Sequence, residues 1–267
     1  MANAPLEDRA VIALSGPDAH TFLQGLITND IGKLEPSKPL YAALLTPQGK
    51  ILFDFILVDD GVGTLLMDCT ATLREALVNR LTLYRLRAKV EIKARDDLVV
   101  FAGREGASLA GGFTDPRLAA LGQRAIAAKQ SNGTTDDYLS HRLALGVAEG
   151  ADFGQDKMFA LDAGLEELHG VSFDKGCYVG QELTARMKHK GTARKRLLPI
   201  GAVDGGVLPS PGTPVLAGQT NIGDITSAYG TRGFALIRLD RLDEIVNFTI
   251  TVGDVSVNVT KPSWLFT

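Results

Sequence analysis

Short apolar runs separated by turn residues dominate the first seventy positions. Four such runs have the length of a β-strand: residues 9–14, 40–46, 51–58 and 64–69. Pro47-Gln48-Gly49-Lys50 and Asp59-Asp60-Gly61 separate the last three runs with residues typical of tight turns. The pattern therefore predicts one strand followed by an antiparallel three-stranded meander.

Helical periodicity marks four other segments. After Ser15-Gly16-Pro17-Asp18, a helix start, Phe22, Leu23 and Leu26 would point inward on a helix that ends near Asn29. Residues 71–86 follow a 3.6-residue period, and residues 136–145 and 179–187 favour two further helices.

The remaining segments before residue 190 are short strands or irregular chain. Strands are expected at residues 88–93, 98–102 and 125–128. Glycine and proline favour a loop over residues 103–117, and the glycine-spotted stretch 149–180 should be irregular.

The pattern changes after Gly191. Residues 201–233 contain eight glycines between short apolar runs, and the β-branched runs 248–252 and 255–259 follow. This pattern predicts a small all-β barrel or sandwich with a boundary near residue 190.

Composition narrows the class of protein. The chain has 267 residues, 45% hydrophobic and 22% charged, with a net charge of -3. These values are typical of a globular protein and exclude a collagen-like or disordered chain. No apolar run approaches 18 residues, so we expect no membrane span. The mild charge gives no reason to expect direct nucleic-acid binding.

Cysteine content and the first residues indicate the compartment. Two cysteines are too few for a disulfide framework, which favours a reducing environment. Glu7 and Asp8 precede any apolar run, unlike a signal peptide or a mitochondrial presequence. We therefore expect a bacterial cytoplasmic protein, or a processed organellar protein of the mitochondrial matrix.

The two cysteines have different surroundings. Cys177 lies between Gly176 and Gly180, just before a predicted helix and two residues after Lys175. A cation and a helix N-terminus both lower a thiol pKa, so Cys177 is a candidate reactive thiol, although a buried turn cysteine is the alternative. Cys69 ends an apolar strand and is expected to be a packed side chain.

Asp54 interrupts the apolar strand ILFDFILV. Strand alternation places it on one face with Leu52 and Ile56. A carboxylate there either serves a ligand or lies at a solvent-facing edge, because an unpaired buried charge is costly.

Six cations occur within eleven residues: Arg186, Lys188, Lys190, Arg194, Lys195 and Arg196. Such a cluster suits phosphate, a polyanionic folate tail or RNA, or is simply a solvated face. The chain lacks the motifs of NAD- and ATP-binding sites, hydrolase elbows and closely spaced metal ligands, so no resident metal is expected.

The segment Lys175-Gly-Cys-Tyr-Val-Gly-Gln-Glu182 resembles the KGCYxGQE signature of the YgfZ-type folate-binding proteins. These are relatives of the aminomethyltransferase (T-protein) of the glycine cleavage system. The continuation Leu183-Thr-Ala-Arg186 resembles the branch that includes the mitochondrial iron–sulfur assembly factor. Leu45-Thr-Pro-Gln-Gly-Lys50 followed by Asp54, and Gly223-Asp-Ile-Thr-Ser227, are also similar to this family.

The resemblance implies an α+β, T-protein-like fold. Two ferredoxin-like α+β parts would surround a central opening, and a small β-barrel would follow. The expected domains are a discontinuous folate-binding domain of residues 1–45 and 130–190, a second α+β domain of residues 46–129, and a barrel of residues 191–267.

The resemblance also implies a tetrahydrofolate site. Asp54 matches the folate-contacting aspartate of T-proteins, and the cofactor residues of the motif and its continuation would be Lys175, Tyr178, Gln181, Glu182 and Arg186. Cys177 would be the reactive thiol of a monomeric accessory protein that works with the iron–sulfur assembly machinery or its client enzymes.

Two departures weaken an aminomethyltransferase role, which is the first alternative. T-proteins carry acids at the positions of Phe53 and Ala144, so the acid–base set here is incomplete. The second alternative is a helper in tRNA modification that uses the basic cluster, but no aromatic residues interleave with it.

Overall fold

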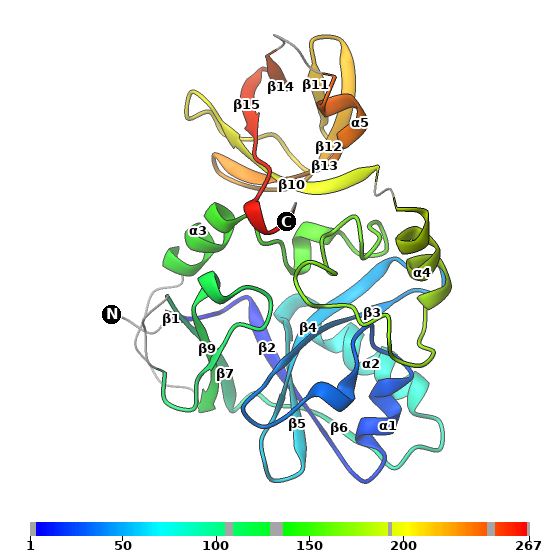
Figure 1. Cartoon of the computed structure of the whole chain (residues 1–267). Helices are drawn as coiled ribbons and strands as arrows, with labels where there is room; N and C mark the ends of the chain where they lie inside the picture. Colours follow the sequence, from blue (N-terminus) through cyan, green and yellow to red (C-terminus); the bar gives the residue numbers. More distant parts are fainter. Residues whose placement is uncertain (1–3, 105–108, 129–135, 192–193, 245–248, 266–267) are drawn as a thin grey trace.

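The computed structural model describes residues 4–104, 109–128, 136–191, 194–244 and 249–265. Within them lie two antiparallel sheets and a closed barrel (Figure 1). The larger sheet has five strands in the order β3 (Leu40–Leu45), β4 (Ile51–Asp59), β5 (Thr64–Thr70), β2 (Arg9–Ser15) and β6 (Glu91–Ala94). The neighbouring β3, β4 and β5 confirm the predicted meander. Strand β6 starts three residues later than expected.

Two helices cover one face of this sheet, α1 (Ala19–Gln24) and α2 (Arg74–Arg85) (Figure 1). Leu23, Leu77 and Leu81 are fully buried and pack in one cluster with Phe55 and Leu57 of β4. Each such side chain contributes about 1.5–3 kcal/mol of hydrophobic free energy. The inward-facing periodicity of both helices is therefore confirmed.

Helix α1 is shorter than predicted. It ends at Gln24, and a 3-10 turn, Ile31–Lys33, follows where the helix was expected to close. The Asp30 carboxylate accepts a hydrogen bond from the Gly32 backbone at 3.0 Å. Between the helix and this turn, Ile27 forms a β-bridge with Leu44 of β3 and the Thr28 backbone donates to the Ala43 carbonyl oxygen at 2.9 Å, so the chain is extended there and does not continue as one helix.

A β-bulge changes the face of Leu52. Leu44 pairs with Phe53, whereas Leu45 pairs with Ile51, so Leu52 is the extra residue of β4. Leu52 packs on the helix-covered face, whereas Ile56 belongs to the cluster on the opposite face. The prediction that Leu52 shares a face with Asp54 and Ile56 is therefore wrong for Leu52.

The smaller sheet has four strands in the order β1 (Ala4–Pro5), β7 (Leu98–Gly103), β9 (Gln123–Ala128) and β8 (Phe113–Thr114). The predicted strands at 98–102 and 125–128 are confirmed. The predicted loop 103–117 contains the two-residue β8, and its residues 105–108 lie outside the described residues. Helix α3 (Asp136–Leu145) has the predicted bounds.

A largely irregular segment covers the second face of the five-stranded sheet. Tyr41 and Ile56 of the sheet are buried there with Val147, Phe153 and Leu165. Helix α4 (Gln181–Lys190) follows this segment, starting two residues later and ending three residues later than predicted. Residues 149–180 are thus irregular, as expected, yet they form part of the core.

The C-terminal part is a closed barrel, which settles the choice between barrel and sandwich (Figure 1). Its strands, in the order in which they pair, are β10 (Lys195–Ala202), β13 (Arg232–Arg238), β12 (Thr220–Tyr229), β11 (Pro214–Ala217), β14 (Ile250–Val252) and β15 (Val255–Val259). Helix α5 (Leu239–Leu242) follows β13, and residue 248 of an expected strand lies outside the described residues.

Of the domain limits expected from the sequence, one falls at the end of a helix and another falls within a sheet. The limit near residue 190 coincides with the end of α4. The limit between residues 45 and 46 falls in the turn between β3 and β4, which are paired strands of one sheet. In the described part of the chain, no helix combines the length and apolar character needed to span a bilayer.

Candidate functional site

The two cysteines lie in opposite environments. Cys177 is exposed, whereas Cys69 of β5 is 2% exposed and lies with its Sγ atom 3.5 Å from the Ala10 carbonyl oxygen. Burial raises the pKa of Cys69 to about 12. The prediction that Cys69 is a packed strand residue is confirmed, and Cys177 is the thiol that a partner can reach.

Lys175 anchors the turn that carries Cys177. We call residues 174–178 the thiol turn. The Lys175 ammonium donates hydrogen bonds to the carbonyl oxygens of Gln24, Ile27 and Asn29, at 2.7, 2.7 and 2.8 Å. The Tyr178 ring centre lies 5.0 Å from the same nitrogen. Burial lowers the pKa of Lys175 to about 8.

The rest of the motif packs on the β3–β4 turn and then leads into α4. A Cβ atom at Gly180 would lie 2.5 Å from the Thr46 carbonyl oxygen, and φ there is +82°, so the position requires glycine. Gln181 is half-buried. Glu182 and Arg186 are exposed and form an ion pair with each other at 2.6 Å.

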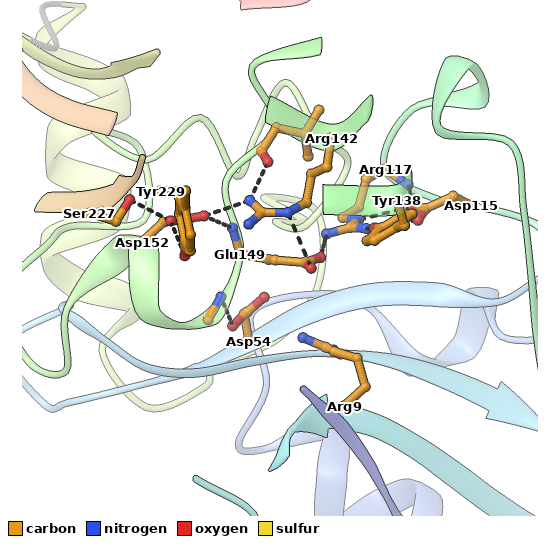
Figure 2. Close-up of polar contacts among 12 residues, drawn as sticks. Arg9, Asp54, Asp115, Arg117, Tyr138, Arg142, Glu149, Asp152, Ser227 and Tyr229 are labelled. Carbon is orange, nitrogen blue, oxygen red and sulfur yellow. Dashed lines mark hydrogen bonds and ion pairs between the residues drawn. The ribbon is translucent and has the colours of Figure 1, made fainter. Parts of the chain in front are cut away.

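Asp54 is buried beneath the second face of the five-stranded sheet, at 3% exposure. Its carboxylate accepts a hydrogen bond from the Gly150 backbone at 3.0 Å (Figure 2). It accepts a second one from the Tyr41 hydroxyl at 3.3 Å. The solvent-facing alternative for Asp54 is therefore wrong. Burial, and secondarily Glu149, raise the pKa of Asp54, although Arg9 and Arg117 oppose them.

A network of buried charges surrounds Asp54, and sequence reasoning missed it. We call it the ion network; each of its members is at most 7% exposed: Arg9, Asp68, Asp115, Arg117, Arg124, Arg142, Glu149 and Asp152. Buried charges are stable only when paired. No spacing or motif marked these residues, because in the sequence each resembles an ordinary surface charge.

Arg124 and Glu149 form the centre of the ion network. Arg124 contacts Asp68 at 2.6 Å, Asp115 at 2.8 Å and Glu149 at 3.1 Å. Glu149 also accepts from Arg117 at 2.5 Å. Burial would raise the pKa of Glu149, but the surrounding arginines hold it well below its ordinary value.

Asp152 connects the ion network to the barrel. Its carboxylate accepts hydrogen bonds from Arg142 at 2.5 Å, from the Ser227 hydroxyl at 2.5 Å and from the Tyr229 hydroxyl at 2.9 Å (Figure 2). Ser227 and Tyr229 belong to β12. The same buried carboxylate thus contacts both the body of the protein and the barrel.

A cavity of about 510 Å³ opens between the two sheets. Tyr41 of β3, Pro116 and Val171 give it apolar walls, and Lys33, Lys38 and His169 also line it. The volume lies within the range of small-molecule sites. The Arg117 guanidinium lies 5.6 Å from the centre of the Tyr41 ring, and the Tyr41 hydroxyl contacts Asp54.

The expected cofactor residues fall into two groups. Asp54 lies behind Tyr41, next to the cavity. The motif residues Lys175, Tyr178, Gln181, Glu182 and Arg186 lie on or after the thiol turn and, in the described part of the chain, are not among the residues that line the cavity. Asn29, which the sequence marked only as the end of a predicted helix, belongs to both places: it lines the cavity, and its carbonyl oxygen accepts a hydrogen bond from Lys175.

Phe53 and Ala144, the two positions at which T-proteins carry acids, lie apart from each other. Phe53 is buried in the core between the sheet and its helices. Ala144 is exposed at a groove between α3 and the barrel, where Pro199 also lies. Ala144 is therefore on a different surface from the cavity.

The basic cluster is partly neutralised. Three of its members form ion pairs: Arg186 with Glu182, Lys188 with Glu166, and Arg196 with Glu167. Among the described residues, no three His, Cys, Asp or Glu side chains come together as a metal site would require.

The chain has the fold of the glycine cleavage T-protein. The crystal structure of the glycine cleavage system aminomethyltransferase T from Bartonella henselae superimposes with a TM-score of 0.73, at 16% sequence identity, over 98% of this chain and 85% of that chain. Residues 194–267 match the family model of the CAF17 C-terminal beta-barrel domain.

Sequence comparison identifies the branch. The mitochondrial iron-sulfur cluster assembly factor IBA57 of Homo sapiens is 31% identical over 299 residues, which cover 97% of this chain and 84% of the human protein. The Mus musculus protein of the same name is 33% identical over 304 residues, with the same coverage. The chain belongs to the family of the iron-sulfur cluster assembly factor IBA57.

Proposed function

We propose that this protein is a folate-binding accessory factor for iron–sulfur cluster assembly or repair, with Cys177 as its reactive thiol. The observation that carries the proposal is the exposure of Cys177 on an anchored turn, in a chain whose relatives are named iron-sulfur cluster assembly factors. The partners would be the assembly machinery or its client enzymes. The names of the relatives favour the mitochondrial matrix as the compartment.

Cys177 suits a shared or transient contact with a cluster. Thiolate is a preferred ligand of iron–sulfur clusters, and a complete site needs about four ligands. This chain has two cysteines, and Cys69 is buried. The cluster is therefore proposed as cargo, held mainly by another protein and touched by Cys177 during assembly.

The cavity between the sheets is proposed as the tetrahydrofolate site. Pro39, Pro116 and Val171 offer apolar contact to a flat pterin ring, and Lys33 and Lys38 offer charge to the carboxylates of its glutamate tail. Asp54 would act on the ligand through the Tyr41 hydroxyl. Reduced folates carry one-carbon units, and this chain would supply the binding site and the thiol nearby.

Aminomethyl transfer has less support. The Asp54 carboxyl is 3% exposed, and its sequence neighbour Phe53 is part of the hydrophobic core. An acid–base catalyst must come within hydrogen-bond reach of its substrate. The similarity to the aminomethyltransferase is a similarity of fold.

The test measures [4Fe–4S] enzyme activity in a strain that lacks this protein. The wild-type chain and Cys69→Ser, the matched control, should restore activity, whereas Cys177→Ser should fold normally and fail, because serine lacks the soft sulfur that iron requires. Full restoration by Cys177→Ser would refute the role of the thiol.

The folate half of the proposal is tested separately. We expect 5-formyltetrahydrofolate to bind the purified protein in calorimetry, and Asp54→Ala to weaken binding by roughly 1–3 kcal/mol. Absence of binding at high micromolar ligand would remove the folate assignment and leave the thiol experiment unaffected.

A further inference from the structure

The thiol turn has few anchors of its own. Asp174, Gly176 and Cys177 are exposed, and a Cβ atom added at Gly176 would meet no described atom within 4 Å. The buried side chains of the turn are Lys175 and Tyr178, each 7% exposed. The position of the Cys177 thiol therefore depends on what holds these two side chains.

Lys175 is held entirely by backbone carbonyls. An ammonium group has three donors, and those of Lys175 meet the carbonyl oxygens of Gln24, Ile27 and Asn29. Gln24 is the last residue of α1, where helix carbonyls lack intrahelical partners and attract a cation. Lys175 thus caps α1 from a distant part of the chain, and its donors are fully used there.

The third carbonyl belongs to Asn29, which is also part of the cavity wall. The Asn29 side-chain amide donates to the carbonyl oxygens of Tyr41 at 2.8 Å and His169 at 2.6 Å. Tyr41 and His169 line the same cavity. Asn29 therefore connects two other residues of the cavity wall, Tyr41 and His169, to Lys175, the anchor of the thiol turn.

Neighbouring contacts strengthen this connection. The Thr28 hydroxyl donates to the Gly170 carbonyl oxygen at 2.6 Å, and the Ser172 backbone donates to the Thr28 carbonyl oxygen at 3.0 Å. The Lys33 ammonium, which lines the cavity, donates to the Ser172 hydroxyl at 3.3 Å. Residues 28–33 and 169–175 are consequently bonded together along their length.

We infer that Lys175 is a positioning residue for Cys177, and that Asn29 and Lys175 transmit occupancy of the cavity to the thiol turn. A ligand that packs on the exposed His169 restrains Asn29 through the hydrogen bond between them. Asn29 in turn restrains Lys175 and the thiol turn. This inference deepens the proposed function and rests on it, since it names how the folate site regulates the thiol. The coupling is a free energy and is therefore reciprocal.

The experiment measures amide hydrogen exchange of the thiol turn, with and without 5-formyltetrahydrofolate. In the wild-type protein the ligand should slow exchange of the two hydrogen-bonded amides that flank the turn, those of Ser172 and Gln181, by about 5-fold or more. Lys175→Met should speed that exchange about 10-fold without ligand, and saturating ligand should no longer slow it. Because the coupling is reciprocal, calorimetry should give an affinity about 5-fold weaker than that of wild type.

Two variants control for charge and for folding. Arg186→Met removes an exposed cation near the turn and should exchange like wild type. Lys175→Arg keeps the charge, but a planar fork cannot serve three convergent carbonyls, so it should behave like Lys175→Met while unfolding at a temperature near that of wild type.

Unchanged exchange in both Lys175 variants would overturn the positioning role. Equal protection of the turn by ligand in wild type and in Lys175→Met would overturn the coupling. If 5-formyltetrahydrofolate does not bind the wild-type protein, the folate assignment and the coupling are both refuted. The exchange rates of wild type and the Lys175 variants without ligand still decide whether Lys175 positions the turn.

Discussion

Two cysteines of one chain differ because of what surrounds each sulfur. Cys69 lies in a central strand, where burial raises its pKa to about 12 and closes access to its sulfur. Cys177 is exposed on a turn that Lys175 ties to the end of α1. At the scale of the residue, access and not cysteine content decides which thiol can act.

Alkylation of the native protein should separate the two thiols. We expect iodoacetamide at pH 8 to modify Cys177 at least about 100-fold faster than Cys69, since the thiolate reacts and Cys69 is buried and protonated. Mass spectrometry of peptides gives both rates. The same reaction in concentrated urea should modify both cysteines at similar rates; comparable rates in the native protein would contradict the assignment.

At the scale of the element, the end of α2 is strained. Leu86 follows the helix with φ of +46° and is 88% exposed. A bulky residue rarely adopts positive φ, and φ of +46° with ψ of −106° is a combination that only glycine adopts readily. The backbone strain at Leu86 therefore costs free energy, and the exposed side chain offsets little of that cost through hydrophobic burial.

Leu86→Gly should stabilise the protein by about 0.5–1 kcal/mol, because relief of strain exceeds the entropy that glycine loses. Leu83 is the matched control: it lies inside α2 and is 67% exposed. Leu83→Gly should destabilise by about 1 kcal/mol, as glycine does in a helix interior. Urea unfolding measures both, and the same sign for the two variants would refute the argument.

At the scale of the whole molecule, the ion network joins parts that hydrophobic clusters leave separate. Arg124 of β9 reaches Asp68 of β5, so it bridges the two sheets. Asp152 reaches Ser227 of the barrel. Buried pairs of this kind contribute little net free energy when complete but are costly to break.

Arg124→Met should lower the free energy of unfolding by about 3–5 kcal/mol, because Asp68, Asp115 and Glu149 each lose a buried partner. Arg95, in an exposed pair with Asp97, serves as control, and Arg95→Met should cost less than about 1 kcal/mol. Equal effects in denaturant unfolding would show that burial of the network is unimportant.

The junction with the barrel should respond to pH. Asp162 is 7% exposed, its carbonyl accepts from Leu197 of β10 at 2.8 Å, and burial raises its pKa to about 6, although Arg196 and Lys195 oppose this. A pKa raised in the folded state gives stability that is present below pH ~4 and lost as pH rises through ~6.

Asp162→Asn removes that titration. Its stability relative to wild type should increase between pH ~4 and ~6 by roughly 2–3 kcal/mol and stay constant above pH ~7. Thermal unfolding of both proteins across this range measures the difference. A difference that does not vary with pH would contradict a raised pKa at Asp162.

The sequence by itself determined the meander, the long helix, the all-β character of the C-terminal part and the family, because alternation, helical period, glycine placement and the KGCY motif are local patterns. It also distinguished Cys69 from Cys177. Each of these features depends on residues a few positions apart, so it could be recognised without knowing the fold.

Only the tertiary structure decided the surroundings of Asp54, Lys175 and Leu52. Asp54 lies behind Tyr41 and against Gly150, Lys175 reaches carbonyls some 150 positions earlier, and the bulge turns Leu52 to the helices. The ion network also joins segments far apart, such as residues 9, 68, 124 and 149. A buried charge is stable only when it is paired with an opposite charge. The partner is far away in the sequence, so the sequence alone does not distinguish such a residue from an ordinary surface charge.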